Sequence, residues 1–326
     1  MVKIAGVDFA PQLVKATRFA PSPNGRLHIG HAFAALCAHD FARAFGGVFQ
    51  LRIEDIDGTR SRPEHIAAII ADMEWLGLHY DGEVVFQSQR VDHYAGALKR
   101  LRDMGLVYRC WCTRSEIVGA LKTKPVRHGP DGPVYPGTCR GVTRKGPYCW
   151  RLDMTAAMER VKSPSSLGEG LGWGLSANSA PFEQPPPPSP LLKGRGELTW
   201  TDLVAGEQSG DPALFGDVVL WRKDAPASYH LAATLDDATD GISHVVRGKD
   251  LFDYTIIHRV LQELLVLPQP VYWHHGLLLD AKGEKLAKSR LSQPLASYHA
   301  QRIDGSELIE QLRRGELPLG ITGGND

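Results

Sequence analysis

The sequence predicts an α/β fold built on a doubly wound parallel sheet with helices on both of its faces. Two stretches predict it: strand and helix signals alternate along residues 14 to about 106, and they return along residues about 211 to 290. Strands that alternate with helices form parallel sheets, which bind ligands at the carboxyl ends of their strands. Residues about 107 to 210 are irregular and hold four of the five cysteines, so we expect an inserted subdomain between the two halves.

The elements of the first half follow one another closely. Leu13, Val14 and Ala16 predict a strand that leads into a loop rich in proline and glycine. Apolar residues then recur at helical spacing from 33 to 44, and a glycine pair at 46 and 47 ends this helix. Residues 48 to 53 are mostly apolar and predict the next strand.

Acidic residues follow this second strand directly. The stretch EDID occupies residues 54 to 57, and Ser61 with Glu64 predicts a capping box for a helix whose apolar residues begin at Ile66. The carboxyl ends of neighbouring parallel strands meet at one edge of a sheet. The loop after the first strand and these acids should therefore share that edge.

The composition is that of an ordinary globular protein. The chain has 326 residues, of which 43% are hydrophobic and 23% are charged, and its formal net charge is zero. A polyanionic partner would therefore have to meet a local basic patch. No run reaches the roughly 18 apolar residues that a membrane span needs, and the N-terminus lacks the apolar core of a signal peptide. The odd number of cysteines argues against a disulfide framework and indicates a reducing cytoplasm. We also expect a monomer without membrane contact.

Two histidines stand at the start of the first helix. The stretch RFAPSPNGRLHIGH, residues 18 to 31, places His28 and His31 three positions apart, so both can point across the first turn. Backbone N–H groups there attract anions, and Gly25 and Gly30 let a ligand approach the backbone closely. Two imidazoles at this place could donate to phosphate oxygens during nucleotidyl transfer. The alternative is that they cap the helix or lie in the core.

A basic loop near the end of the chain favours the phosphate interpretation. Residues 282 to 290 read KGEKLAKSR and place Lys285 and Lys288 after an apolar run. Two ammonium groups on a mobile loop can close on a triphosphate and stabilise the departing pyrophosphate. A solvated basic turn is the alternative for these lysines taken alone. Together, HIGH and the KMSKS-like KLAKS resemble the signature motifs of the class I aminoacyl-tRNA synthetases.

Longer stretches narrow the resemblance. RFAPSPNGRLHIGH, GGVFQLRIEDIDGTRSRPE and SHVVRGKDL are similar to the glutamyl-tRNA synthetase group, and the similarity covers most of residues 14 to 291. It implies a Rossmann-like catalytic domain with an inserted zinc-bearing α+β connective subdomain. The expected parts are 1–106 for the first half of the catalytic domain with an N-terminal extension at 1–13, 107–210 for the inserted subdomain, 211–290 for the second half ending in the KMSKS-like loop, and 291–326 for a short tail.

The resemblance also implies the residues of the site. It places glutamate contacts on Arg18, Phe19, Ala20, Pro21, Ser22, Glu54, Tyr229 and Arg247, ATP contacts on His28, Gly30, His31 and Lys288, and catalytic roles on His28, His31, Lys285 and Lys288. Arginine suits the bidentate binding of a carboxylate, and a carboxylate suits an ammonium group. Taken alone, Glu54 and Arg247 could equally form surface ion pairs, which are common. His230 departs from the glutamine that the family often has and could change a glutamate or adenylate contact.

Cysteines in the irregular segment suggest a zinc site. The three that offer thiolates are Cys110, Cys112 and Cys139. Zinc takes four ligands in a tetrahedron, and chemistry alone leaves the fourth open among Tyr135, Cys149 and His128. Three buried free thiols are the alternative. The segment resembles the glutamyl-Q branch of the family, which has a CxC and later a tyrosine four residues before a cysteine, and this resemblance implies Tyr135 as the fourth ligand of one structural Zn²⁺.

Two further features of the irregular segment bear on RNA. Residues 163 to 197 are rich in glycine, proline and serine and predict a disordered insertion, with a proline-rich docking segment as the alternative. Basic side chains that could contact an RNA backbone, or could simply be solvated, are Lys122, Lys124, Arg127, Arg140, Arg144 and Lys145.

The end of the chain directs the choice within the family. The 36 residues from 291 to 326 leave no room for the helical anticodon-binding domain of a full glutamyl-tRNA synthetase, so we expect the glutamyl-Q branch. The resemblance then implies that L-glutamate and ATP, with Mg²⁺, give glutamyl-adenylate without tRNA. It implies that glutamate next passes to the queuosine base at the wobble position of tRNA(Asp).

Three rival functions remain at this stage. They are a truncated glutamyl-tRNA synthetase that charges a tRNA 3′ end, a small-molecule nucleotidyltransferase, and a non-catalytic RNA-binding paralogue. The stretches RIEDIDGTR and VVRG argue against the second rival, and the intact HIGH and KLAKS motifs argue against the third.

Overall fold

The computed structural model describes residues 1–122, 126–130, 132–163, 198–286 and 293–324. The expectations for Lys124, for Lys288 and for nearly all of the 163–197 insertion lie outside the described residues.

The first half forms a parallel sheet in the strand order β3-β4-β5. Its elements alternate along the chain as β3 (Ala16–Phe19), α1 (Ile29–Ala44), β4 (Val48–Ile53), α2 (Pro63–Trp75) and β5 (Val85–Phe86). β3 and β5 both pair with β4 in parallel. The predicted alternation and the predicted parallel pairing are confirmed for this half.

The second half contributes a sheet in the order β11-β10-β14-β13. These strands are β10 (Thr199–Asp202), β11 (Gly206–Ser209), β13 (His244–Gly248) and β14 (Val271–His275). β14 pairs in parallel with β13 and β10, whereas β11 is an antiparallel edge strand. The two sheets meet along β3 and β13, where Ser243 N donates to Ala16 O at 3.1 Å. The fold therefore contains one parallel sheet and one mixed sheet whose central pairings are parallel.

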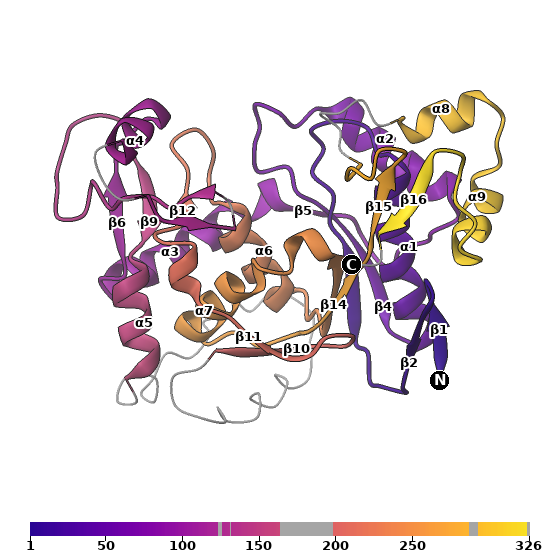
Figure 1. Ribbon diagram of the computed structural model, residues 1–326, viewed down its shortest axis with the longest axis horizontal. Helices are drawn as coiled ribbons and strands as arrows, with labels where there is room; N and C mark the ends of the chain where they lie inside the picture. Colours follow the sequence, from indigo (N-terminus) through magenta and orange to yellow (C-terminus); the bar gives the residue numbers. More distant parts are fainter. Residues whose placement is uncertain (123–125, 131, 164–197, 287–292, 325–326) are drawn as a thin grey trace.

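Side chains alternate between the two faces of these sheets and enter two cores. Val246 of β13 and Trp273 of β14 lie in the core with α1 and α2, whereas Val245 and Tyr272 lie in the other core. The second core also contains side chains from α3 (Val91–Asp103), α6 (Tyr229–Thr239) and α7 (Thr255–Leu265). Helices therefore cover both faces, as Figure 1 shows.

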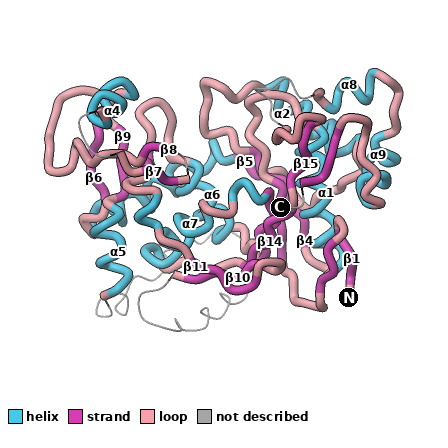
Figure 2. Tube along the Cα trace, viewed as in Figure 1, coloured by secondary structure: helices cyan, strands magenta, loops and turns pink. Residues whose placement is uncertain are grey.

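The cysteine-bearing segment forms a group of its own at one end of the molecule (Figure 2). Its antiparallel sheet has the order β12-β9-β6, with β6 (Val107–Cys110), β9 (Cys149–Leu152) and β12 (Val219–Trp221). Around it lie α4 (Arg114–Leu121), α5 (Met154–Lys162) and the hairpin of β7 (His128–Gly129) and β8 (Gly132–Pro133). Strand pairing crosses the boundary expected at residue 210, because β10 pairs with β14 and β12 pairs with β9. The division into domains stays a prediction.

Both ends of the described chain pack against the first core. The hairpin of β1 (Val2–Ile4) and β2 (Val7–Phe9) places Phe9 edge-on against Phe41, with ring centroids 5.2 Å apart. Near the other end, α8 (Leu295–Ala300) and α9 (Gly305–Arg313) bury apolar side chains in the same core. β16 (Ile321–Gly324) pairs antiparallel with β15 (Leu277–Asp280). The remaining short elements are 3₁₀ turns: η1 (Gln87–Arg90), η2 (Pro212–Leu214) and η3 (Lys249–Leu251).

The capping box predicted for α2 was wrong. The N-cap residue is Arg62, whose side chain makes no capping hydrogen bond, and Pro63 occupies the first helical position. Proline has a φ suited to that position and no N–H that needs a partner. It therefore sets the start of this helix in place of Ser61.

Candidate active site

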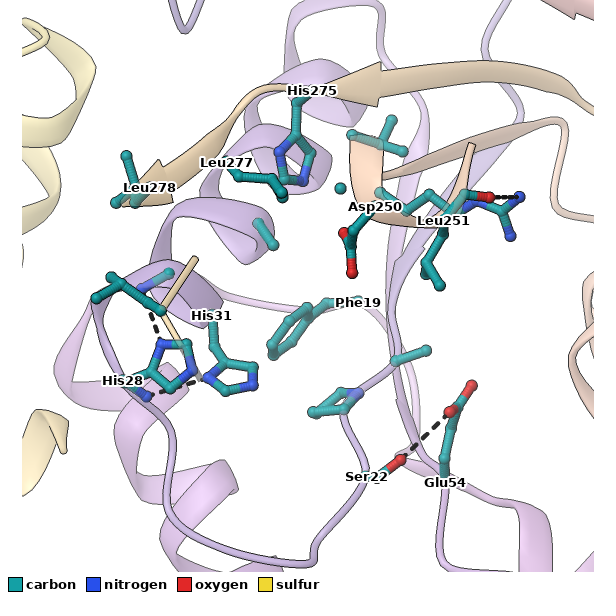
Figure 3. Close-up of a pocket in the computed structure, with 18 of the residues that line it drawn as sticks. Phe19, Ser22, His28, His31, Glu54, Asp250, Leu251, His275, Leu277 and Leu278 are labelled. Atoms are coloured by element: carbon teal, nitrogen blue, oxygen red, sulfur yellow. Dashed lines mark hydrogen bonds between the residues drawn. The ribbon is translucent and has the colours of Figure 1, made fainter. Parts of the chain in front are cut away.

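A cavity of about 420 Å³ opens at the carboxyl ends of β3, β4, β13 and β14 (Figure 3). It brings together all the described residues of the predicted site outside the cysteine segment: Arg18, Phe19, Ala20, Pro21, Ser22, His28, Gly30, His31, Glu54, Tyr229, Arg247 and Lys285. Glu54 N donates to Pro21 O at 3.1 Å, and Ser22 Oγ lies 3.5 Å from Glu54 Oε2. The predicted shared edge of the opening loop and the EDID acids is thus confirmed.

His28 and His31 cap α1 with one nitrogen each. His28 is the N-cap residue, and its Nδ1 accepts a hydrogen bond from Gly30 N at 3.1 Å; His31 Nδ1 accepts from His28 N, also at 3.1 Å. A neutral imidazole has one donor and one acceptor nitrogen, so each neutral ring carries its proton on Nε2. Both rings line the cavity, with centroids 3.8 Å apart. Capping therefore orients two N–H donors and does not exclude a role in phosphate binding.

Gly30 makes this packing possible. A Cβ atom at position 30 would lie 3.1 Å from both Cε1 and Nδ1 of His28. This separation is shorter than an ordinary carbon contact of about 3.5–4.0 Å. A side chain there would displace the His28 ring.

Glu54 belongs to a buried network of opposite charges. Among the described residues the network contains three guanidiniums and four carboxylates, from Arg18, Arg52, Arg90, Glu54, Asp236, Asp237 and Asp240. Arg52 is fully buried and lies 2.8 Å from Asp237 Oδ1 and 4.0 Å from Glu54 Oε1. Burial raises the pKa of Glu54 to about 7, against the lowering effect of Arg52 and Arg18. A ligand ammonium group beside Glu54 would balance the excess carboxylate.

Arg18 forms a bidentate ion pair within the protein, with Asp237. Its Nε donates to Asp237 Oδ1 at 2.8 Å, its Nη2 to Asp237 Oδ2 at 3.3 Å, and its Nη1 to Val246 O at 3.3 Å. Asp237 therefore neutralises much of the charge that Arg18 presents to the cavity.

Arg247 has the opposite environment. It is 6% exposed, and no carboxylate of the described residues lies within ion-pair distance of it. Its hydrogen-bond partners are all neutral. Arg247 Nε donates to His274 Nε2 at 3.1 Å. Nη1 donates to Tyr229 OH at 3.4 Å and to His258 Nδ1 at 3.3 Å, and Nη2 donates to Thr255 Oγ1 at 2.7 Å and to Leu251 O at 3.1 Å. A buried charge is stable when it is paired. Arg247 is thus the residue of this cavity best suited to hold a carboxylate ligand.

His274 and Asp202 hold Arg247 in place, and neither residue was predicted from the sequence. His274 Nδ1 lies 2.8 Å from Asp202 Oδ2 and donates to it, which leaves His274 Nε2 as the acceptor for Arg247. Burial, with Arg247, lowers the pKa of His274 to about 4, so the ring is neutral near pH 7. Both residues lie at the carboxyl ends of strands, which is the one sequence signal that could have found them.

His230 does not line the cavity that holds the predicted contacts. Its Nδ1 lies 3.4 Å from His258 Nε2, and it lines a second cavity of about 310 Å³ next to the cysteine segment. Burial lowers its pKa to about 4, with a smaller contribution from Arg247. Any effect of His230 on glutamate would act through His258, which contacts Arg247.

The lysine side of the cavity contains an ion pair. Lys285 pairs with Asp250, and both residues line the cavity. Asp250 and His275 were also missed by the sequence reasoning, although each lies at or just after the carboxyl end of a strand. Lys288 lies outside the described residues.

The predicted zinc ligands converge. The sulfur atoms of Cys110, Cys112 and Cys139 all lie within 4.8 Å of one another, and the three residues are buried. The Tyr135 hydroxyl lies 3.3 Å from Cys110 Sγ and 3.6 Å from Cys112 Sγ. Sulfurs bound to one tetrahedral zinc at about 2.3 Å would be about 3.8 Å apart, so this donor set fits the ion.

The two alternative ligands are placed differently. Cys149 lies opposite Cys110 in the pairing of β6 with β9, but it is not one of the three converging thiols. His128 is exposed on the β7–β8 hairpin.

The basic residues of this segment divide into two groups. Arg140 is bound to Asp217 at 2.8 Å, Arg127 donates to Ala213 O at 2.7 Å, and Arg144 lies 3.6 Å from Glu116. Lys122 and Lys145 are exposed.

The fold and the site define a class of protein. The family described as "tRNA synthetases class I (E and Q), catalytic domain" matches residues 14–157 and 192–320. The chain is therefore a ligase of the aminoacyl-tRNA synthetase type.

Curated relatives narrow the class. A "Glutamyl-Q tRNA(Asp) synthetase" of Rhodobacter capsulatus is 45% identical over 294 residues, which cover 90% of this chain and 97% of that protein. Proteins of the same name from Symbiobacterium thermophilum and Nocardia farcinica are 38% and 40% identical, over 90% and 95% of this chain and 84% and 83% of theirs. The chain belongs to the family of the glutamyl-Q tRNA(Asp) synthetases.

Solved structures share the fold. A glutamate-tRNA synthetase from Elizabethkingia anophelis matches with a TM-score of 0.62 and 24% identity, over 85% of this chain. This chain spans about half of that protein, since the match covers 53% of its length. None of the helices in the described part of this chain is long and apolar enough to cross a membrane.

Proposed function

We propose that this protein activates L-glutamate with ATP to glutamyl-adenylate and then transfers glutamate to the queuosine base at the wobble position of tRNA(Asp). The observation that carries the proposal is the cavity of about 420 Å³ at the carboxyl ends of β3, β4, β13 and β14. It joins two oriented imidazole donors to a carboxylate and a guanidinium that suit the two ends of an amino acid.

Glu54 and Arg247 are the two residues proposed to bind the charged groups of glutamate. Glu54 takes the ammonium group, because the network around it has one carboxylate more than it has guanidiniums. Arg247 takes the carboxylate that does not react, because its described partners are all neutral. The five N–H groups of Arg247 already have neutral acceptors, so the ligand carboxylate would replace one of the longer of these hydrogen bonds, such as the one to Tyr229 OH at 3.4 Å. A carboxylate held by a guanidinium loses nucleophilicity, so the reacting carboxylate should lie on the side of His28 and His31.

The two histidines and the lysines act on the phosphates in this proposal. The Nε2–H groups of His28 and His31 donate to phosphate oxygens, and the N-terminus of α1 adds its own positive potential. Lys285 and Lys288 stabilise the departing pyrophosphate, and Mg²⁺ would enter with ATP as part of the nucleotide.

The activation step needs no covalent enzyme intermediate. An oxygen of the glutamate α-carboxylate attacks the α-phosphorus in line, a new P–O bond forms, and the bond to the bridging oxygen of pyrophosphate breaks. The nucleophile is already ionised at neutral pH, so no general base is required. Orientation by Glu54 and Arg247 then supplies much of the rate enhancement.

The queuosine acceptor is supported by the family alone. Relatives named glutamyl-Q tRNA(Asp) synthetase cover most of this chain, and this chain covers 97% of one of them. An anticodon stem resembles an acceptor stem in being an A-form helix with an exposed single-stranded end, and RNA is recognised largely by shape.

A structural zinc ion is part of the proposal. Cys110, Cys112, Cys139 and Tyr135 would hold it, since their donor atoms converge in a buried cluster. The ion would join the start of α4 to the loop before β9. It would stabilise this loop, which packs few apolar side chains of its own.

Two experiments test the proposed reaction. ATP–pyrophosphate exchange should occur with glutamate and without tRNA; exchange that requires tRNA or another amino acid would contradict the activation step. Labelled glutamate loaded on queuosine-containing tRNA(Asp) should be recovered on the anticodon fragment after ribonuclease digestion. Equal loading of tRNA without queuosine, or label on the 3′-terminal adenosine, would instead indicate charging at the 3′ end.

A further inference from the structure

His275 presents an unused hydrogen-bond acceptor to the candidate active site. It is the last residue of β14 and is 4% exposed. Its ring lines the cavity on the side opposite Glu54 (Figure 3). Its Nδ1 lies 2.8 Å from Gly276 O. Only a protonated Nδ1 can donate to a carbonyl, so the neutral ring carries a lone pair on Nε2.

This lone pair has no partner among the described residues. His275 Nε2 is buried and makes no hydrogen bond with them. Burial lowers the pKa of His275, so the ring is neutral and cannot turn Nε2 into a donor at neutral pH. Buried acceptors without a donor are rare in folded proteins, because they lose their hydrogen bonds to water without replacement.

Packing fixes the direction in which the acceptor points. Phe33 of α1 contacts the His275 ring edge-on, with centroids 5.5 Å apart and an interplanar angle of 87°. Together with the Gly276 carbonyl, this contact holds the ring in one orientation. A ligand in the cavity therefore meets an acceptor that is already placed.

The surroundings of His275 suit the nucleoside part of a nucleotide. Glu54 and Arg247 occupy the part of the cavity that we assign to glutamate, and His28 and His31 occupy the part that we assign to phosphates. Near His275 the cavity wall includes Leu277 and Leu278, whose apolar side chains suit a flat base, and the carboxylate of Asp250, which can accept from a ribose hydroxyl. Gly248 adds no side chain there, and a Cβ atom at this position would lie 2.9 Å from Leu277 Cδ2.

We propose that His275 Nε2 accepts a hydrogen bond from the nucleoside of ATP and is a specificity-determining residue for this nucleotide. The inference rests on the proposed function for the identity of the nucleotide. Two donors share the required chemistry, the exocyclic amino group of adenine and the ribose hydroxyls. A guanine base would present a carbonyl oxygen in place of the amino group and would repel the lone pair.

Equilibrium titration of the full chain with nucleotides and Mg²⁺, without glutamate or tRNA, tests the proposal. The ligands are ATP, purine riboside triphosphate, which lacks the amino group, and the 2′-deoxy and 3′-deoxy forms of ATP. The variants are His275→Leu, which removes the acceptor, and His275→Gln, which can place an amide oxygen near Nε2. Phe33→Leu is the matched control, because it changes the packing of the ring and keeps the acceptor. Thermal unfolding of each variant checks that it folds.

Removal of the acceptor should weaken ATP binding about tenfold, and His275→Gln should restore part of the loss. The loss should vanish for the one analogue that lacks the donor: for purine riboside triphosphate if the amino group donates, and for a deoxy form if a ribose hydroxyl donates. An equal loss with every nucleotide would mean that His275 only packs, and no loss would also overturn the proposal. Phe33→Leu keeps the acceptor and only loosens the ring, so its loss should be smaller than that of His275→Leu. If the wild type binds ATP in the expected pattern but shows no glutamate-dependent exchange, the proposed reaction fails and this inference stands.

Discussion

Replacing Glu54 by glutamine removes the negative charge that should hold the ammonium group of glutamate. The glutamine has nearly the same shape, so the change acts mainly on charge. Hydrogen bonds between ionised groups contribute roughly 1.5–3 kcal/mol, which corresponds to roughly a 10- to 150-fold change in affinity. The Glu54 side chain is 12% exposed, so water screens little of this interaction. We expect the KM for glutamate to rise by this factor, while the KM for ATP stays within about twofold of the wild-type value.

Glutamate-dependent ATP–pyrophosphate exchange measures both constants, and Glu83→Gln, an exposed change on the same half of the chain, is the matched control. The wild-type KM for glutamate should also depend on pH. Because burial raises the pKa of Glu54 to about 7, the carboxyl is roughly nine-tenths protonated at pH 6, and the KM should be about tenfold higher there than at pH 8. The Glu54→Gln variant should lose this dependence.

Stability provides the check on folding. A carboxyl group whose pKa is raised in the folded state favours folding below its unfolded pKa, and this contribution is lost as the pH rises from about 4.5 to about 7. At pH 8 the buried ionised carboxylate therefore opposes folding, and the glutamine variant should melt at the same or a higher temperature than the wild type. A folded Glu54→Gln variant with an unchanged KM for glutamate at pH 8 would refute the assignment of the ammonium site.

Three further changes test other parts of the site. Gly30→Ala should lower the kcat of exchange roughly tenfold with little change in the KM for glutamate, because the added methyl group displaces the His28 ring. An unchanged kcat would show that the orientation of the His28 ring does not matter for the reaction. Cys112→Ser should abolish zinc binding, measured by elemental analysis, and lower Tm by about 5 °C. The control Cys37→Ser changes a buried cysteine of α1 outside the cluster and should keep the metal. A metal content of zero in the wild type would contradict the zinc proposal. His274→Leu should raise the KM for glutamate about tenfold, and His274→Gln, which can still accept from the guanidinium, should be milder; equal effects of the two would point to packing alone.

The first half of the fold was largely predictable because its signals are local. The periodicity from 33 to 44 predicted most of α1, and the apolar run from 48 to 53 predicted β4 with its bounds. The capping box of α2 failed because two local signals competed at the same place. Pro63 and Ser61 both mark a helix start, and the backbone geometry of proline determined which one prevailed.

Pairing between distant strands was not predictable in the same way. β10 lies in the segment that we expected to be irregular, and the short sequences of β10 and β12 carry no information about which strand each one pairs with. Both pair across the boundary expected at residue 210. β10, from before this boundary, joins β14 of the catalytic sheet, and β12, from after it, joins β9 of the cysteine-bearing segment.

The sequence by itself predicted that the loop after the first strand and the acids after the second strand share one edge, because the carboxyl ends of parallel strands meet there. The other residues of the site were implied by the resemblance to the glutamyl-tRNA synthetase group. The sequence also determined that cysteines near 110 and 139 could share a metal. Only the tertiary structure decided which charges neutralise one another. Arg18 and Asp237 are 219 positions apart and form a bidentate pair, whereas Arg247 is surrounded by neutral imidazole, hydroxyl and carbonyl groups. The physical reason is that burial and pairing set the strength of a charge, and both depend on neighbours that the local sequence does not specify.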